Sequence, residues 1–296
     1  MNTKLPIPQQ SLEFDKNAAE AWVKNETDLE IKSIKAKIIK NIRRVGFDDF
    51  RIKSETVTKE ALEYLTKTKE KYAVFFDYKP HSSKRWVYEL NKNCYAKNPP
   101  FETGHFTPTW EKISGNKRLI ILAEKDINTF LIIDDAAYSG EQIAHRQIEP
   151  IIKFYEESRF TQKPKFVLAI PFVTNRFLRL IEDLKNQSGC EIILYTSSIM
   201  PKLKEILTVK EVKLLQNKRD GRLETTDNEP IYLNATLTYF DHRVADDHSF
   251  SAEVKKALNL SAQKTYSDKT SDYFNKEEQE FEDYKNRIFP NKNLPI

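Results

Sequence analysis

Two adjacent carboxylates stand where a buried strand is expected to end. The apolar run Phe130–Ile133 leads directly into Asp134 and Asp135. A short segment of mostly small residues, Ala136–Gly140, follows, and a helical pattern begins after it. In open α/β sheets, ligands bind just outside the carboxyl ends of the strands. Carboxylates can accept hydrogen bonds from a sugar diol, and a helix start offers free N–H groups to a phosphate. The spacing therefore predicts a sugar-phosphate site.

A group of hydrogen-bond donors follows an earlier apolar run, Tyr72–Phe76. In the segment DYKPHSSKR, the candidate donors are two serines and three basic residues, which are Lys79, Ser82, Ser83, Lys84 and Arg85. These donors suit an anion. The alternative is a helix that a serine caps and whose basic side chains are solvated. Because the carboxyl ends of parallel strands share one edge of a sheet, this segment is expected near the acidic pair.

The third group is the string YFDHRVADDH near the end of the last expected strand. Asp241 or His242 is a candidate general base, and Arg243 is a candidate phosphate contact. A metal site and a surface loop with satisfied turn hydrogen bonds are the alternatives. We expect the run Leu233–Phe240 to join the sheet in parallel, which would bring this group to the Asp134–Gly140 loop. An antiparallel strand would place it at the opposite edge.

Buried strands alternate with amphipathic helices through the middle of the chain. Apolar runs predict strands at Tyr72–Phe76, Arg118–Ala123, Thr129–Asp135, Lys165–Val173 and Glu191–Ser198. Helices are expected between them, and Pro150 is expected to kink or split the one that begins near Gly140. Continuous apolar strands separated by helices indicate a parallel sheet covered on both faces. The predicted fold class is therefore α/β, with a doubly wound, mainly parallel sheet.

Three regions of different character divide the chain. Residues 1–70 form an expected N-terminal helical region, because apolar residues recur there at helical spacing. Residues 71–250 form the expected α/β core, and residues 251–296 form a polar tail. Within the core, residues 98–116 contain three prolines and two glycines and predict a long loop. Such a loop is either a mobile lid or a flexible connector.

The segment FLIIDDAAYSGEQ resembles the fingerprint of the type I phosphoribosyltransferases. That fingerprint has four apolar residues, an acidic pair, three variable residues, Thr-Gly, one variable residue and Thr. The acidic pair and Gly140 match in place, Ser139 replaces the first threonine, and Gln142 replaces the second. Tyr138 stands where purine-salvage members often carry an aspartate that acts as general base. An apolar strand ending in acidic residues also occurs in response regulators and in Mg²⁺-dependent phosphatases, or arises by chance.

The resemblance implies a sheet of the phosphoribosyltransferase type that binds phosphoribosyl pyrophosphate with Mg²⁺. Asp134 and Asp135 would hold the ribose hydroxyls, directly or through waters of the metal ion. The 5′-phosphate loop would comprise Ala136, Ala137, Tyr138, Ser139, Gly140, Glu141 and Gln142. The pyrophosphate contacts would be Lys79, Ser82, Ser83, Lys84, Arg85 and Arg243. Asp241 or His242 would supply the base that Tyr138 lacks.

The function that follows is transfer of the phosphoribosyl group to an unidentified acceptor. The alternative is a regulator or a secreted bacterial effector that keeps the fold, has lost catalysis and acts by binding. The glutamate-rich segment KEEQEFED resembles the carboxyl-terminal signals of type IV secreted effectors, although a solvated helical tail is the simpler interpretation.

Composition limits the partners and the cellular location that can be expected for this protein. A formal charge of +4 is too small and too dispersed to argue for nucleic acid. Two distant cysteines favour a reducing compartment. With no apolar run of bilayer length, a cytoplasmic protein without a membrane span is expected, and secretion into a host cell is the alternative location. A homodimer is compatible with these observations.

Overall fold

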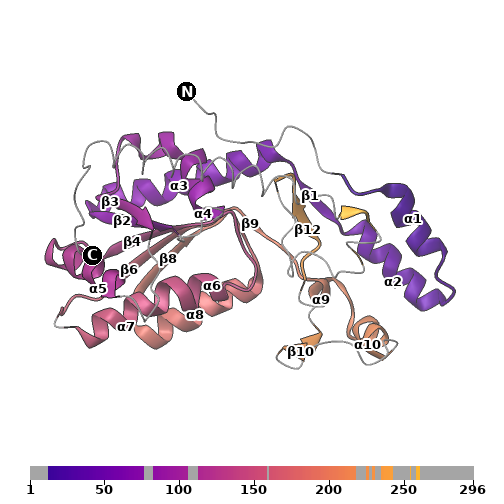
Figure 1. Cartoon of the computed structure of the whole chain (residues 1–296). Coiled ribbons are helices and arrows are strands. Elements are labelled where there is room, and N and C mark those ends of the chain that lie inside the picture. Colours follow the sequence, from indigo (N-terminus) through magenta and orange to yellow (C-terminus); the bar gives the residue numbers. More distant parts are fainter. Residues whose placement is uncertain are drawn as a thin grey trace, which may run out of the picture.

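A computed structural model describes the structure of most of the chain. The described residues are 13–76, 83–105, 113–158, 160–217, 225–226, 229–230, 235–242, 254 and 258–260. They form an α/β protein in which a parallel sheet lies between two layers of helices, with a second group of helices beside it (Figure 1).

Five parallel strands form the central sheet. They are β2 (Tyr72–Phe76), β3 (Glu102–His105), β4 (Thr129–Ile133), β6 (Lys165–Ala169) and β8 (Glu191–Tyr195). Their order is β3-β2-β4-β6-β8, and every neighbouring pair is parallel. The chain therefore runs from β2 outward to β3, returns to β4 on the other side of β2, and continues in the opposite direction. This reversal between β2 and β4 is a topological switch point, where open α/β sheets bind ligands.

The side chains of β4 show why its sequence is uniformly apolar. Phe130 and Ile132 pack with the helices on one face of the sheet, and Leu131 and Ile133 pack with the helix on the other. Successive strand residues point to opposite faces, so a strand that is covered twice needs apolar residues at every position. The predicted parallel sheet with helices on both faces is therefore confirmed.

Helices cover both faces (Figure 1). On one side lie α3 (Phe47–Thr68) and α4 (Ser83–Leu90), and on the other lie α5 (Ile113–Glu124), α7 (Glu149–Glu157) and α8 (Asn175–Ser188). The predicted strand at residues 118–123 is wrong, because this apolar run belongs to α5. Leu119 and Leu122 are buried against the sheet, while Ile120 and Ile121 are partly exposed, which is the spacing of a helix.

Pro150 lies in the first turn of α7, and the helical stretch is split as expected. The chain passes through α6 (Glu141–Ile143) and a π-helical turn, η2 (Ala144–Ile148), before α7 begins. Proline has no N–H to donate to the preceding turn, and a helix is commonly distorted at that point.

Three strands continue past a bend into a second small parallel sheet. Its strands are β5 (Ala136–Ala137), β7 (Phe172–Val173) and β9 (Ser198–Ile199), in the order β5-β7-β9. Each follows a central strand after two residues, so the sheet is prolonged beyond its central part. Asp134 and Asp135 lie in the bend between β4 and β5.

A second core lies beside the sheet and joins segments that are far apart in the sequence. It contains α1 (Lys16–Lys24), α2 (Leu29–Lys40), α9 (Leu203–Ile206) and α10 (Val209–Asn217), with β1 (Arg43–Val45) paired in parallel with β12 (Thr238–Phe240). Ile34 and Leu258, for example, are buried together in this core. Two further short strands, β10 (Thr225–Thr226) and β11 (Glu229–Pro230), form an antiparallel pair.

The structure differs from two expectations, one about the long loop and one about the last strand. The expected long loop at residues 98–116 contains β3 and the start of α5, because β3 adds to the free edge of β2. The last strand does not join the central sheet; β12 pairs with β1, so residues 43–45 of the expected helical region form a strand. In addition, α3 packs on the sheet and shares its core. Among the described residues, no helix combines the length and apolar character needed to cross a bilayer.

Candidate functional site

The first carboxylate, Asp134, connects the ends of two neighbouring strands. Its Oδ1 accepts a hydrogen bond of 2.7 Å from the Ser83 hydroxyl, at the start of the helix that follows β2. The same oxygen accepts the backbone N–H of Asp135 at 2.9 Å. The Lys84 ammonium lies 4.0 Å from Oδ2. The expected meeting of the two segments at one sheet edge is therefore present at these residues.

The second carboxylate, Asp135, pairs with His242. The imidazole Nε2 lies 3.2 Å from Asp135 Oδ2, and the other oxygen accepts the Ala136 N–H at 2.8 Å. The two side chains are 1% and 3% exposed. A buried carboxylate is costly unless hydrogen bonds satisfy it, and here each oxygen has a donor or a ring nitrogen beside it. The YFDHR string thus reaches the acidic pair through its histidine.

Aromatic rings from three elements surround the His242 imidazole. Its ring centroid lies 4.3 Å from that of Phe50, 5.0 Å from Trp86 and 5.2 Å from Phe240. These residues belong to α3, α4 and β12. The rings fix the orientation of the imidazole and exclude water from its contact with Asp135.

Asp241 faces away from the acidic pair, toward the connection between β1 and α3. Its Oδ1 accepts the Arg44 Nε–H at 3.0 Å, and its Oδ2 accepts the Phe47 backbone N–H at 3.0 Å. The hydrogen bond from Arg44 raises the pKa of that guanidinium above its usual value. Asp241 therefore links the end of β12 to β1. Its partners differ from those of His242, the other candidate base, which lies beside Asp135.

The predicted phosphate loop is shorter than its sequence indicated. Ala136 and Ala137 form strand β5, paired with β7, so they are part of a sheet and not of a loop. The turn begins at Tyr138, whose side chain is buried and whose carbonyl accepts the Thr174 hydroxyl. Ser139 Oγ accepts the Glu141 N–H at 3.4 Å. What remains of the expected loop is residues 138–140, because Glu141 and Gln142 belong to α6.

Gly140 is required where it stands. Its φ of 78° is left-handed, and a Cβ built there would lie 2.3 Å from Phe177 Cδ2. Both features exclude a side chain, because a β-carbon disfavours this φ and the aromatic ring fills the space. The glycine thus lets the turn after β5 pack directly on α8, a role different from approach to a ligand.

The Glu141 side chain accepts a 2.7 Å hydrogen bond from Arg176 on α8, and Gln142 is exposed in the first turn of α6. Arg85 lies half-buried on α4. Lys79, Ser82 and Arg243 lie outside the described residues, so the expected pyrophosphate contacts are placed only for Ser83, Lys84 and Arg85.

Three residues of the site carried no signal that the sequence analysis used. Arg44 lies in a short strand within a region predicted to be helical, and Phe50 and Trp86 resemble ordinary core residues in sequence. Their common feature is proximity to the YFDHR string, which depends on the pairing of β1 with β12. The regular apolar spacing at Val45 and Phe50 did not distinguish them from other buried positions.

The acidic pair is a poor direct ligand set for Mg²⁺. Asp135 is buried against His242, and Asp134 lies beside a hydroxyl donor and an ammonium. Within the part of the chain that the structure describes, no group of three or more His, Cys, Asp or Glu side chains could hold a metal ion. A hard cation prefers several oxygen ligands with open geometry.

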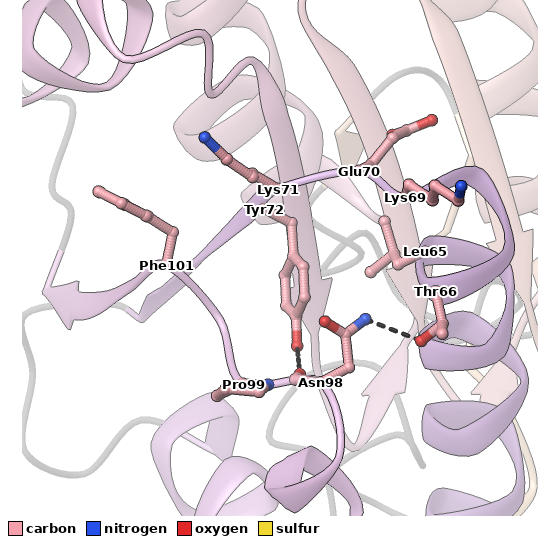
Figure 2. Close-up of a pocket in the computed structure, with 9 residues that line it drawn as sticks. All are labelled: Leu65, Thr66, Lys69, Glu70, Lys71, Tyr72, Asn98, Pro99 and Phe101. Atoms are coloured by element: carbon pink, nitrogen blue, oxygen red, sulfur yellow. Dashed lines mark hydrogen bonds between the residues drawn. The ribbon is translucent and has the colours of Figure 1, made fainter.

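A cavity of about 340 Å³ lies at the opposite, amino-terminal edge of the sheet (Figure 2). The Tyr72 hydroxyl crosses it to the Asn98 carbonyl, and the Asn98 amide donates to Thr66. These hydrogen bonds join β2 and α3 to the segment before β3, and the cavity is remote from the acidic pair.

Comparison of the chain with protein-family models, with curated proteins and with solved structures gave no match in any of the three.

Proposed function

We propose that this chain binds phosphoribosyl pyrophosphate, or a closely related sugar phosphate, at the carboxyl edge of β2 and β4. The observation that supports it is the position of Asp134 and Asp135 at the switch point of the sheet, with Ser83 joined to the acidic pair. Ligands of open α/β sheets bind at this position. The resemblance of residues 130–142 to the phosphoribosyltransferase fingerprint gives the ligand its chemical class.

The two carboxylates have different roles in this proposal. The Asp134 side chain is 11% exposed and contacts the ribose hydroxyls after exchanging its hydrogen bond from Ser83. Asp135 is buried and holds the bend in place through His242. Mg²⁺, if the ligand requires it, arrives on the diphosphate oxygens, which it prefers as ligands. Lys84 adds positive charge beside that diphosphate.

Phosphoribosyl transfer is the activity expected of such a site, and binding without transfer is the second candidate. The burial of the candidate bases favours the second. Asp241 is bound to Arg44, and the His242 imidazole is enclosed by aromatic rings. A general base must reach the proton that it abstracts, either directly or through one water. A positioned base contributes about 10²–10⁴ in rate, so a site without one retains its ligand and loses most of its turnover.

Binding is tested by thermal unfolding with phosphoribosyl pyrophosphate and Mg²⁺. At about 100 times the dissociation constant, the ligand should stabilise the wild type by about 2.7 kcal/mol and raise its melting temperature. Asp134→Asn should lose this shift, and the exposed Asp183→Asn on α8 should keep it. Circular dichroism of both apo variants controls for folding. A wild type that shows no shift at millimolar ligand contradicts the proposal.

Release of diphosphate against pooled bases, amines and water then separates the two candidates. Turnover that Asp134→Asn abolishes establishes the transferase. A melting shift without turnover in any pool establishes the binding protein.

A further inference from the structure

A second cavity, of about 690 Å³, lies on the side of the molecule where β1 approaches α8 and β9. One wall comes from the end of α2 and from β1, with Lys40, Arg43 and Arg44. The other comes from Asn175, Ile199 and Pro201. We call this space the basic cleft. Cavities of this size hold cofactors and nucleotides in other proteins.

Two of the three cations in the basic cleft lack an acidic neighbour. Arg44 is paired with Asp241 and Glu13. In contrast, no carboxylate of the described residues lies within 4.0 Å of the Lys40 ammonium or the Arg43 guanidinium, and both residues are exposed. None of the residues that line the cleft is acidic. The cleft therefore offers two cationic groups to an anion.

The opposite wall adds an apolar surface. Ile199 is 47% exposed in β9, and Pro201 lines the same cleft. Apolar side chains next to cations suit a ligand with a planar ring at one end and phosphates at the other. Asn175 is the first residue of α8, and its side-chain amide donates to Glu205 at 3.2 Å.

Lys202, which follows Pro201, has basic residues beside it. Its pKa is lowered to about 8, mainly by burial, and the positive charges of Arg176 and Lys204 contribute in the same direction. A lysine whose protonation is opposed by surrounding cations lies in a region of positive potential. Such a region attracts anions beyond the contacts that they make directly.

We propose that the basic cleft binds a nucleoside diphosphate or triphosphate, with its phosphates on Lys40 and Arg43 and its base against Ile199 and Pro201. The cleft is separate from the acidic pair, so this inference does not depend on the proposed function. Arg44 links the two places, because it lines the cleft and binds Asp241, whose neighbour His242 binds Asp135.

The inference is tested by isothermal titration of the full chain with ADP, with adenosine and with inorganic diphosphate. ADP should bind more tightly than either part alone, and its affinity should fall as salt is raised. The double substitution Lys40→Gln with Arg43→Gln should weaken ADP by about tenfold or more, because a hydrogen bond to a charged group contributes on that scale. Ile199→Ser should weaken ADP and leave diphosphate unchanged.

Lys16→Gln, an exposed lysine on α1 outside the cleft, is the matched control and should leave ADP binding unchanged. Equal losses in this control and in the double variant would overturn the proposal, and so would wild type that binds no ADP at millimolar concentration. Binding of single-stranded RNA but not of ADP would overturn it in favour of a nucleic-acid surface.

Testing each variant with the ligand of the other site separates this inference from the proposed function. ADP binding should persist in Asp134→Asn, and the melting shift with phosphoribosyl pyrophosphate should persist in the double cleft variant. Loss of ADP binding in Asp134→Asn would show a single site and overturn the assignment of a separate cleft.

Discussion

Single residues in this protein are fixed by partners that lie far away in sequence. The Asp135 carboxylate has His242 as its partner, and Asp241 has Arg44. Asp241 and His242, which are adjacent at the end of β12, therefore contact two different parts of the molecule: Asp241 contacts β1, and His242 contacts the bend after β4. Removing one member of such a pair leaves a buried charge without its partner, which costs more than the pair contributes when intact.

Lys202 supplies a pH dependence of known sign. Its pKa is about 8 in the folded chain and 10.5 without the protein environment, because burial opposes the charge. Between these values the unfolded chain holds the proton and the folded chain does not, so stability rises with pH across this window. Lys202→Met should increase stability at pH 7 and remove a slope of up to about 1.4 kcal/mol per pH unit between pH 8 and 10.5.

Urea unfolding of wild type and Lys202→Met at several pH values measures this difference, and subtracting the two curves cancels the titration of other groups. Lys16→Met, at an exposed position of α1 whose charge does not act on the pKa of Lys202, serves as the control and should leave the slope in place. An identical slope in wild type and Lys202→Met would contradict the prediction.

At the scale of elements, hydrogen bonds at the start of α8 connect this helix to the candidate site. Thr174 is its N-cap: the hydroxyl oxygen accepts the Phe177 N–H at 3.3 Å and the hydroxyl donates to the Tyr138 carbonyl. Phe177 in turn lies where a β-carbon of residue 140 would be. One helix start therefore positions the turn that follows β5.

Thr174→Ala should destabilise the fold by about 1–3 kcal/mol, because it removes a helix cap and leaves a buried carbonyl without its donor. Thr174→Ser keeps the hydroxyl and should recover most of this loss. Chemical denaturation of the three proteins measures both effects. A serine variant as unstable as the alanine variant would show that the methyl group, and not the hydroxyl, carries the stability.

The elements also show what the sequence could predict. The strands β2, β4, β6 and β8 were predicted because each is a short run of mostly apolar residues between helical patterns. The same rule failed at residues 118–123, where a short apolar run does not distinguish a strand from a helix buried along one side. The strand β5 was missed because two alanines after an acidic pair carry no strand signal, and the ladder with β7 determines their conformation.

For the candidate site, the acidic pair and its approach to the segment after β2 could be predicted, because the carboxyl ends of parallel strands share an edge. We also expected His242 to lie near the acidic pair, but only because we expected the last strand to join the central sheet. Instead, β12 pairs with β1, and His242 comes close to Asp135 from there. Nothing in a three-residue strand between two helices indicates that partner, because its pairing is set by packing across almost two hundred residues.

At the scale of the whole molecule, an aromatic cluster joins the sheet to the second core. Phe50 on α3 is fully buried, and its ring contacts Trp86 on α4, Phe172 on β7 and Phe240 on β12. Helices α3 and α4, which cover the central sheet, the extension of that sheet and the β1–β12 pair all meet at this side chain. The two cores are therefore expected to unfold together.

Phe50→Ala should lower the free energy of unfolding by about 3–5 kcal/mol, since it opens a cavity that the surrounding rings cannot fill. Hydrogen exchange should increase both in β7 and in β12, because the cluster supports the two sheets jointly. Ile52→Ala, on the exposed side of the same helix, is the control and should change little. Faster exchange in β12 alone would show that the two cores are independent.

The pairing of β1 with β12 also has a consequence for synthesis on the ribosome. Helices α1 and α2 leave the exit tunnel early, but residues that cover their apolar sides, such as Leu237 and Leu258, follow about two hundred residues later. At about 5–20 residues per second, the nascent chain carries uncovered aliphatic side chains for roughly 10 seconds or more. During this interval the chain offers a binding surface to chaperones that the finished protein conceals.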